Sequence, residues 1–345
     1  MQHFKKNGKL IWISLFIAAA GFLAFMLPAS NQLKISKGTH IMLIGNNLGS
    51  RMIEADFFET EMQLRYADSM LYIRNMCDGG NTPGFRPHSG RNTPWAFPGA
   101  EKFQTELAKP ADMEGFVEYP DEWLSKHQAD IIIAFFGYNE SFQGAPGLAN
   151  YKAELDAFIK HTLAQRYNGR SAPQLALVSP IAFENLSGKY DLPNGVAENA
   201  NLKMYALAMK EVAAKNKVHF IDAYTPSKTW LDDPKTELTI DGAQLNNAGY
   251  AQFGPFLADE VFGKKNSGSP NREAVYAAVM EKNWMWHNDY KIPNGVHVFG
   301  RRYNPFGPDN YPAEQKKIRE MTLIRDTAIW MAAKGIRMDV AAADS

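Results

Sequence analysis

The chain is poor in cysteine and has no surplus of charge. Cys77 is the single cysteine among 345 residues, which excludes an intrachain disulfide framework and a cysteine-rich zinc module. Lys plus Arg and Asp plus Glu each total 37, and this balance argues against a nucleic-acid-binding protein, which normally carries a basic excess. The histidines show no metal-ligand spacing such as His-Glu-x-x-His. We therefore expect no metal, no cofactor and no nucleic-acid partner.

One long uncharged apolar run stands near the N-terminus. Lys5, Lys6 and Lys9 precede residues 10–27, which carry no charge and are followed by Pro28-Ala29-Ser30. A basic N-terminal region, an apolar stretch and small residues after it predict an export signal. The run is also just long enough to cross a bilayer as an anchor. We expect residues 1–30 to be a signal peptide or an N-terminal membrane anchor, and the protein to be extracytoplasmic, either periplasmic or secreted.

Short apolar runs alternate with amphipathic stretches between about residues 38 and 262. Continuous apolar runs such as residues 131–136 suit strands that are buried on both faces of a parallel sheet. The alternation therefore predicts an α/β fold, a three-layer α/β/α sandwich with a five-stranded parallel sheet. The predicted strands are residues 40–44, 70–74, 130–136, 174–179 and 218–221, and the predicted helices are residues 48–66, 151–166, 198–216 and 246–262.

Two segments do not follow this alternation. Residues 77–120 are rich in Gly and Pro but also contain Phe85, Trp95 and Phe97, so we expect an ordered cover over part of the sheet edge. Residues 271–312 carry eight aromatic side chains and lie after a linker-like break at 264–270; a helical stretch from 312 to about 337 follows them.

We therefore divide the chain into three parts. Residues 1–30 form the leader, residues 31–265 the α/β domain, and residues 266–345 an aromatic-rich, helical C-terminal extension. Eight exposed aromatic rings would make an unusually large apolar surface. We therefore expect the extension to pack on the α/β domain.

Polar residues and glycines follow each predicted strand, where open parallel sheets bind their ligands. In chain order, the four most informative groups are Gly45-Asn46-Asn47-Leu48, Gly79-Gly80, Gly137-Tyr138-Asn139-Glu140 and Asp241-Gly242-Ala243-Gln244. In order and spacing they resemble the four sequence blocks of the SGNH (GDSL) hydrolase family. The resemblance implies a flavodoxin-like five-stranded parallel sheet and activity on esters of lipids, acetylated sugars and similar substrates.

The chain departs from that family at two catalytic positions. Asn47 stands where the family has its nucleophilic serine, and Gln244 stands where it has its histidine base. An amide is not a nucleophile in water, and glutamine takes no proton near neutral pH. The resemblance therefore implies a degenerate triad of Asn47, Asp241 and Gln244, in which Asp241 holds the Gln244 amide.

The resemblance also implies an oxyanion hole. The N–H groups of Asn47 and Gly80 and the side chain of Asn139 occupy its donor positions, and two of these three donors are backbone groups. We expect a polar pocket that holds a small-molecule or carbohydrate ester ligand, with weak or absent hydrolysis.

Other interpretations remain open. Glu140 and Glu184 follow neighbouring strands and would suit a carboxylate pair or substrate contacts, although such residues commonly anchor loops. His88 could act as a displaced base, and Cys77 could act as a nucleophile. An active hydrolase that uses non-standard residues, namely Glu140, Glu184 or His88, is therefore the alternative enzyme hypothesis. A third alternative is a non-catalytic subunit of a membrane-attached assembly, tethered through residues 10–27.

Overall fold

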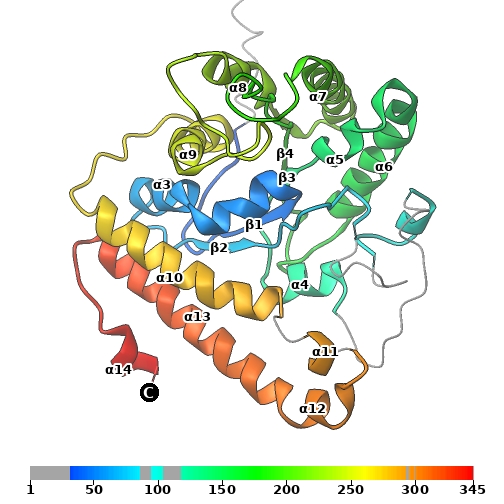
Figure 1. Cartoon of the computed structure of the whole chain (residues 1–345). Coiled ribbons are helices and arrows are strands. Elements are labelled where there is room, and N and C mark those ends of the chain that lie inside the picture. The colour runs from blue at the N-terminus through cyan, green and yellow to red at the C-terminus, as the bar shows by residue number, and fades with distance from the viewer. Residues whose placement is uncertain (1–31, 86–94, 104–117, 293–294, 299, 345) are drawn as a thin grey trace, which may run out of the picture. The chain divides into compact units, whose positions relative to one another are not determined.

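A parallel five-stranded sheet organises the described part of the chain (Figure 1). The computed structural model describes residues 32–85, 95–103, 118–292, 295–298 and 300–344. The strands have the order β2-β1-β3-β4-β5, and every neighbouring pair is parallel. Their bounds are β1 (His40–Gly45), β2 (Tyr72–Asn75), β3 (Ile131–Phe135), β4 (Gln174–Val178) and β5 (His219–Ile221). All five predicted strands are confirmed to within two residues at each end.

Helices cover both faces of this sheet. Helices α6 (Gly144–Ala164) and α7 (Val196–Asn216) pack on one face, where their apolar residues share a core with β1 and β3. Helices α3 (Phe57–Arg65) and α9 (Asn247–Phe262) pack on the other face. The three-layer α/β/α sandwich is therefore confirmed. Short helices α5 (Tyr138–Ser141) and α8 (Tyr224–Leu231) follow β3 and β5.

The predicted single helix over residues 48–66 is wrong in its continuity. The chain forms α2 (Asn47–Ser50), a 3₁₀ turn η1 (Arg51–Glu54) and then α3. Asp56 caps α3, because its side chain accepts a hydrogen bond of 2.7 Å from the N–H of Glu59. Ala55 before it has non-helical backbone angles. The backbone therefore leaves the helical conformation at Ala55, and the cap at Asp56 starts a separate helix.

The Gly/Pro-rich segment is ordered where the structure describes it. Phe85, Trp95 and Phe97 are buried in the same core as α6, and the 3₁₀ turn η2 (Ala100–Phe103) and helix α4 (Pro120–Lys126) belong to this region. The aromatic residues therefore form the expected cover. Residues 86–94 and 104–117 lie outside the described residues.

The C-terminal extension contains two long helices, α10 (Arg272–Tyr290) and α13 (Tyr311–Ala333), which lie side by side (Figure 1). Ion pairs join Asp289 to Arg319 and Glu281 to Arg325, so the two helices run antiparallel. Helix α13 confirms the predicted helical stretch, whereas α10 occupies residues for which no helix was predicted. The shorter α11 (Gly295–Val298), α12 (Tyr303–Asp309) and α14 (Val340–Asp344) complete the extension.

Helix α10 packs against α3 and places its aromatic side chains unequally. Trp286 and Tyr290 are buried and stack on one another with ring centroids 5.8 Å apart. Trp284, in contrast, is 67% exposed. Trp284 and Trp286 therefore do not form one common binding surface. None of the described helices is long and apolar enough to cross a membrane, and residues 10–27 lie outside the described range.

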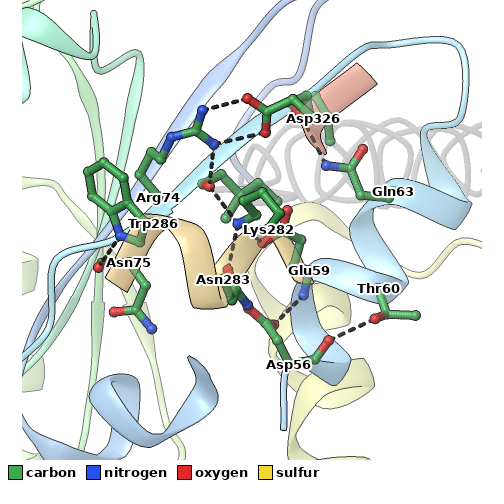
Figure 2. A network of polar contacts seen from close by, with 12 residues as sticks. Asp56, Glu59, Thr60, Gln63, Arg74, Asn75, Lys282, Asn283, Trp286 and Asp326 are labelled. Atoms are coloured by element: carbon green, nitrogen blue, oxygen red, sulfur yellow. Dashed lines mark hydrogen bonds and ion pairs between the residues drawn. The ribbon is translucent and has the colours of Figure 1, made fainter. Parts of the chain in front are cut away.

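A buried polar network joins the extension to the α/β domain beside β2 (Figure 2). Arg74 of β2 donates to both carboxylate oxygens of Asp326 in α13, at 2.9 and 2.5 Å. Lys282 of α10 donates to Glu59 of α3 at 2.6 Å. Because buried charges are tolerated when they are paired and hydrogen-bonded, these contacts define how the extension packs.

Candidate functional site

The first loop of the site begins at a glycine that no other residue could replace without strain. Gly45 ends β1 with a φ of +118°, and a Cβ built there would lie 2.1 Å from the carbonyl oxygen of Phe135. The N–H of Asn46 donates to that same oxygen at 2.9 Å. The Asn46 side chain then accepts from the N–H of Leu48 and caps α2. This close approach to β3 places Asn47 at the first position of α2.

The fourth sequence block forms a fixed carboxylate–amide pair. Asp241 Oδ2 accepts a hydrogen bond of 2.7 Å from Gln244 Nε2. Its Oδ1 accepts from the N–H groups of Ala243 and Gln244 at 2.9 and 2.8 Å, an Asx-type turn. The pairing expected from the sequence is thus present, and it orients the Gln244 amide from one side.

Asn47 and Gln244 line the same small cavity. Its volume is about 20 Å³, enough for about one water molecule. Other lining residues come from the ends of β3 and β4 and the residues that follow them, among them Tyr138 and Ser179, and from α9, which contributes Tyr250. The enclosed part of the site therefore accepts a carbonyl oxygen or a similarly small group.

Gly80 and Asn139 do not line this cavity but lie in loops that reach it. A Cβ built on Gly79 would lie 3.7 Å from Asn47 Oδ1, so the second loop passes beside Asn47. Asn139 Nδ2 donates to the carbonyl oxygen of Asn81 at 3.0 Å, which joins the second and third loops. The backbone N–H groups of Asn47 and Gly80 donate to no other group within the described residues. The loops that carry the expected oxyanion donors are thus neighbours in space, and the amide of Asn139 donates to the second loop.

Glu140 is buried behind the site. Its Oε2 accepts from the N–H of Gly137 at 3.0 Å, while its Oε1 has no hydrogen-bond partner among the described residues. Burial and the nearby Glu154 carboxylate raise the pKa of Glu140 to about 8. At neutral pH the carboxyl group is therefore mostly protonated and holds the turn that leads to Tyr138 and Asn139.

Glu184 has the geometry of a loop anchor. Its carboxylate accepts from the N–H of Leu238 at 3.1 Å and from both the N–H and the hydroxyl of Thr239. The side chain is buried, and neither it nor Glu140 lines the cavity. The two glutamates are therefore engaged with the backbone, and their proposed substrate contacts stay a prediction.

The two alternative nucleophilic or basic residues differ in what the structure shows. Cys77 is buried beside Gly49, and burial raises the pKa of its thiol well above the usual value. Such a thiol remains protonated at neutral pH and is a poor nucleophile. His88 lies outside the described residues. Among the described residues, no group of three or more His, Cys, Asp and Glu side chains could hold a metal ion.

Three cavity residues were not identified from the sequence. Tyr138 is the variable position of the Gly-x-Asn block, and burial together with Asp241 and Glu198 raises its phenol pKa. Tyr250 donates from its hydroxyl to the carbonyl oxygen of Leu48 at 2.9 Å and closes the cavity beneath α2.

The third residue is Ser179. Its hydroxyl oxygen accepts from the N–H groups of Ala223 and Tyr224 at 2.9 and 3.1 Å, and the hydroxyl donates to the carbonyl oxygen of Pro180. These bonds hold the hydroxyl in a structural role. Ser179 therefore does not replace the serine that the first loop lacks.

Comparison with known proteins supports the sequence resemblance. Residues 85–252 match the family model described as the GDSL-like Lipase/Acylhydrolase family. The matched range includes Asn139, Asp241 and Gln244 and begins after Asn47 and Gly80. No curated protein sequence matches the chain.

Solved structures that are similar to this chain include that of Axe2, an acetylxylan esterase from Geobacillus stearothermophilus. It is 13% identical, with 69% of this chain and 100% of that chain covered and a TM-score of 0.47. A single-residue mutant of the same enzyme is 15% identical with the same coverage and TM-score. A gut microbial diltiazem-metabolizing enzyme is 14% identical, with 67% of this chain and 49% of that chain covered and a TM-score of 0.44.

Proposed function

We propose that this chain, which the match over residues 85–252 identifies as SGNH/GDSL-hydrolase-like, binds an ester or carbohydrate-ester ligand and hydrolyses it weakly or not at all. One observation carries this proposal. Gln244 donates to Asp241 at 2.7 Å and faces the cavity that Asn47 also lines. On the sequence resemblance, these two amides stand where hydrolysis by the family's mechanism needs a hydroxyl nucleophile and an imidazole base.

The amide pair is suited to binding. A glutamine amide has two N–H donors and one carbonyl acceptor; one donor of Gln244 bonds Asp241, and the remaining groups serve a ligand. Asn47 adds a second amide, whose side chain makes no hydrogen bond to any described residue. A carbonyl oxygen or a sugar hydroxyl meets donors from both side chains.

The same arrangement disfavours turnover. Neither amide supplies a nucleophile or accepts a proton near pH 7. In a well-studied serine protease, losing such a pair costs about 10⁶ in turnover, and oxyanion donors with binding alone leave about 10³–10⁴ over water. We expect the backbone donors at Asn47 and Gly80 to contribute that residual rate at most.

The experiment compares wild type, Asn47→Ala and the double variant Asn47→Ser with Gln244→His, using 4-nitrophenyl acetate as the probe. We expect near-background turnover for the first two proteins and measurable turnover for the double variant. We also expect wild type to bind an acetylated monosaccharide and Gln244→Leu to bind it more weakly. This result supports the binding role. Robust wild-type turnover that survives Asn47→Ala overturns the proposal and directs mutagenesis to Glu140, Glu184, His88 and Cys77.

We further propose that the protein acts outside the cytoplasm, with residues 1–30 as its export signal or anchor. The proposal rests on the three lysines before the uncharged run at residues 10–27. A fusion to an alkaline phosphatase that is active only after export tests it, with deletion of residues 1–30 as the control. Activity that persists without the leader contradicts the proposal, and recovery in the membrane fraction favours the tethered subunit.

A further inference from the structure

Side chains of the C-terminal extension satisfy the outer edge of β2. The N–H groups of Tyr72 and Met76 bond to Thr39 and Leu43 of the β1 segment at 3.1 and 2.7 Å, so the alternate peptide groups face away from the sheet. The carbonyl oxygens that face away belong to Leu71, Ile73 and Asn75. They accept from Trp330 Nε1 at 3.1 Å, Lys282 Nζ at 3.1 Å and Trp286 Nε1 at 2.7 Å, respectively.

This series of bonds gives each outward carbonyl a donor from α10 or α13 (Figure 2 shows the Lys282 and Trp286 side chains). The donors are buried, since Lys282 and Trp286 are 0% and 1% exposed. Buried carbonyl groups without partners are costly. The extension therefore fixes β2 from the side that no neighbouring strand covers.

The bond from Trp286 to Asn75 differs from the other two because the Asn75 side chain contacts the loops of the candidate site. Asn75, whose carbonyl accepts from Trp286, donates from Nδ2 to the carbonyl oxygen of Gly49 at 2.8 Å. Its Oδ1 accepts from the N–H of Cys77 at 3.0 Å. Gly49 belongs to α2, which begins at Asn47, and Cys77 begins the loop that carries Gly80. One buried side chain thus spans both loops of the candidate site.

An ion pair joins α10 to the same loop at a second point. Lys291, directly after α10, lies 2.7 Å from Asp78, and the N–H of Asp78 donates to the carbonyl oxygen of Gly45 at 2.8 Å. Asp78 immediately precedes Gly79-Gly80. The end of α10 therefore contacts the second loop through Asn75 and Asp78, at both sides of Cys77.

We propose that the C-terminal extension sets the geometry of the site, with Trp286 and Asn75 as positioning residues for the loops of Asn47 and Gly80. The proposal rests on the proposed function insofar as these loops bind the ligand. Trp286 fixes the Asn75 peptide, the Asn75 side chain fixes Gly49 and Cys77, and those bonds orient the N–H groups of Asn47 and Gly80. None of these residues touches the ligand.

The test uses Trp286→Phe with Trp330→Phe as its matched control. Each variant removes one indole N–H from a β2-edge carbonyl and keeps an aromatic ring. The Trp330 bond lies at Leu71, away from the site loops, and the Leu71 carbonyl also accepts from Gln63 Nε2 at 3.1 Å. Hydrogen–deuterium exchange is measured on the full chain over residues 46–50 and 76–81. We expect about tenfold faster exchange there in Trp286→Phe, and unchanged exchange in Trp330→Phe at a similar Tm.

Equal effects of the two variants on these loops, or no effect of Trp286→Phe, overturn the proposal. If Trp286→Phe fails to fold, Lys291→Met replaces it and is expected to accelerate exchange over residues 76–81, with Lys291→Arg restoring the wild-type rate. Unchanged exchange in Lys291→Met then overturns the proposal. The exchange measurement needs no ligand, so it stands apart from the binding test. Where wild type binds the acetylated monosaccharide, Trp286→Phe is expected to weaken binding and Trp330→Phe is not.

Discussion

Lys282 Nζ lies 2.6 Å from Glu59 Oε2, and both side chains are almost completely buried although 223 positions separate them in the sequence. The ammonium group also donates to Asn283 Oδ1 at 2.6 Å and to the carbonyl oxygen of Ile73. Burial raises the pKa of Glu59 to about 7 in spite of Lys282. The pair therefore joins the extension to α3 at considerable electrostatic cost.

Removing one member of this pair should strongly destabilise the fold. We expect Lys282→Met to lower the free energy of unfolding by about 3–5 kcal/mol, because it leaves Glu59 buried without its partner. Urea denaturation followed by circular dichroism measures the change. Lys228→Met is the control, since its exposed pair with Asp232 contributes ~0–1 kcal/mol. Similar losses for the two variants would contradict the structural role of Lys282.

Glu140 should make the stability depend on pH. Its pKa is raised from 4.5 to about 8 in the folded protein, so the folded state holds a proton that the unfolded state has released between these values. Its contribution is therefore most favourable below pH 4.5 and declines as the pH rises to about 8. We expect Glu140→Gln to gain Tm relative to wild type over this range, by on the order of 5 °C.

Differential scanning fluorimetry at several pH values between 5 and 8.5 measures this effect. Glu237→Gln serves as the control, because ion pairing with Lys189 lowers the pKa of Glu237 and its carboxyl is ionised throughout that range. Its Tm difference from wild type should stay constant. A constant difference for Glu140→Gln as well would mean that the Glu140 carboxyl is ionised in the folded protein.

Gly45→Ala should disrupt the first loop of the site. The new Cβ would meet the Phe135 carbonyl oxygen at 2.1 Å, and we expect a loss of about 3 kcal/mol or more in the free energy of unfolding. Gly38→Ala is the matched control: its φ is +73° and nothing lies within 4 Å of its Cβ position. It should cost about 1–2 kcal/mol for the backbone conformation alone. Equal costs would show that Gly45 is not confined by β3.

Cleavage in the linker at residues 264–270 should leave the two fragments together. The side-chain bonds from α10 and α13 to β2 and α3 hold the extension without the peptide connection. Limited proteolysis followed by size-exclusion chromatography should give one peak that contains both fragments. A C-terminal fragment that elutes by itself as a folded piece would mark the extension as an independent module.

The sheet was predictable because its strands are apolar on both faces. Residues 131–136 form an unbroken apolar run, and the structure buries every residue of β3. Helix α10 was not predicted because its buried face carries Lys282, Asn283 and Asp289. Those polar residues break the apolar periodicity that marks a helix. The partners of Lys282 and Asn283 lie in and directly before α3, more than 200 positions away, and Asp289 pairs with α13.

The candidate site was predictable where local sequence order determines it. Asp241 and Gln244 are three residues apart, and their pairing follows from one turn. The roles of Tyr138, Ser179 and Tyr250 depend on how separate loops meet, which spacing does not encode. The same holds for Asn75, an ordinary strand residue by sequence, whose contacts with Gly49 and Trp286 join segments from three parts of the chain.

The outward carbonyl groups of β2 have a consequence for handling the protein. An α/β domain expressed without residues 271–345 would present a bare strand edge, and an unpaired edge is a template for pairing with another chain. Without Trp286 the carbonyl group of Asn75 would lose its donor. Without Lys282 and Trp330 the carbonyl groups of Ile73 and Leu71 would keep only the side chains of Arg74 and Gln63 as donors. We expect such a fragment to self-associate and precipitate. By covering the edge of β2, the extension therefore protects the α/β domain from aggregation.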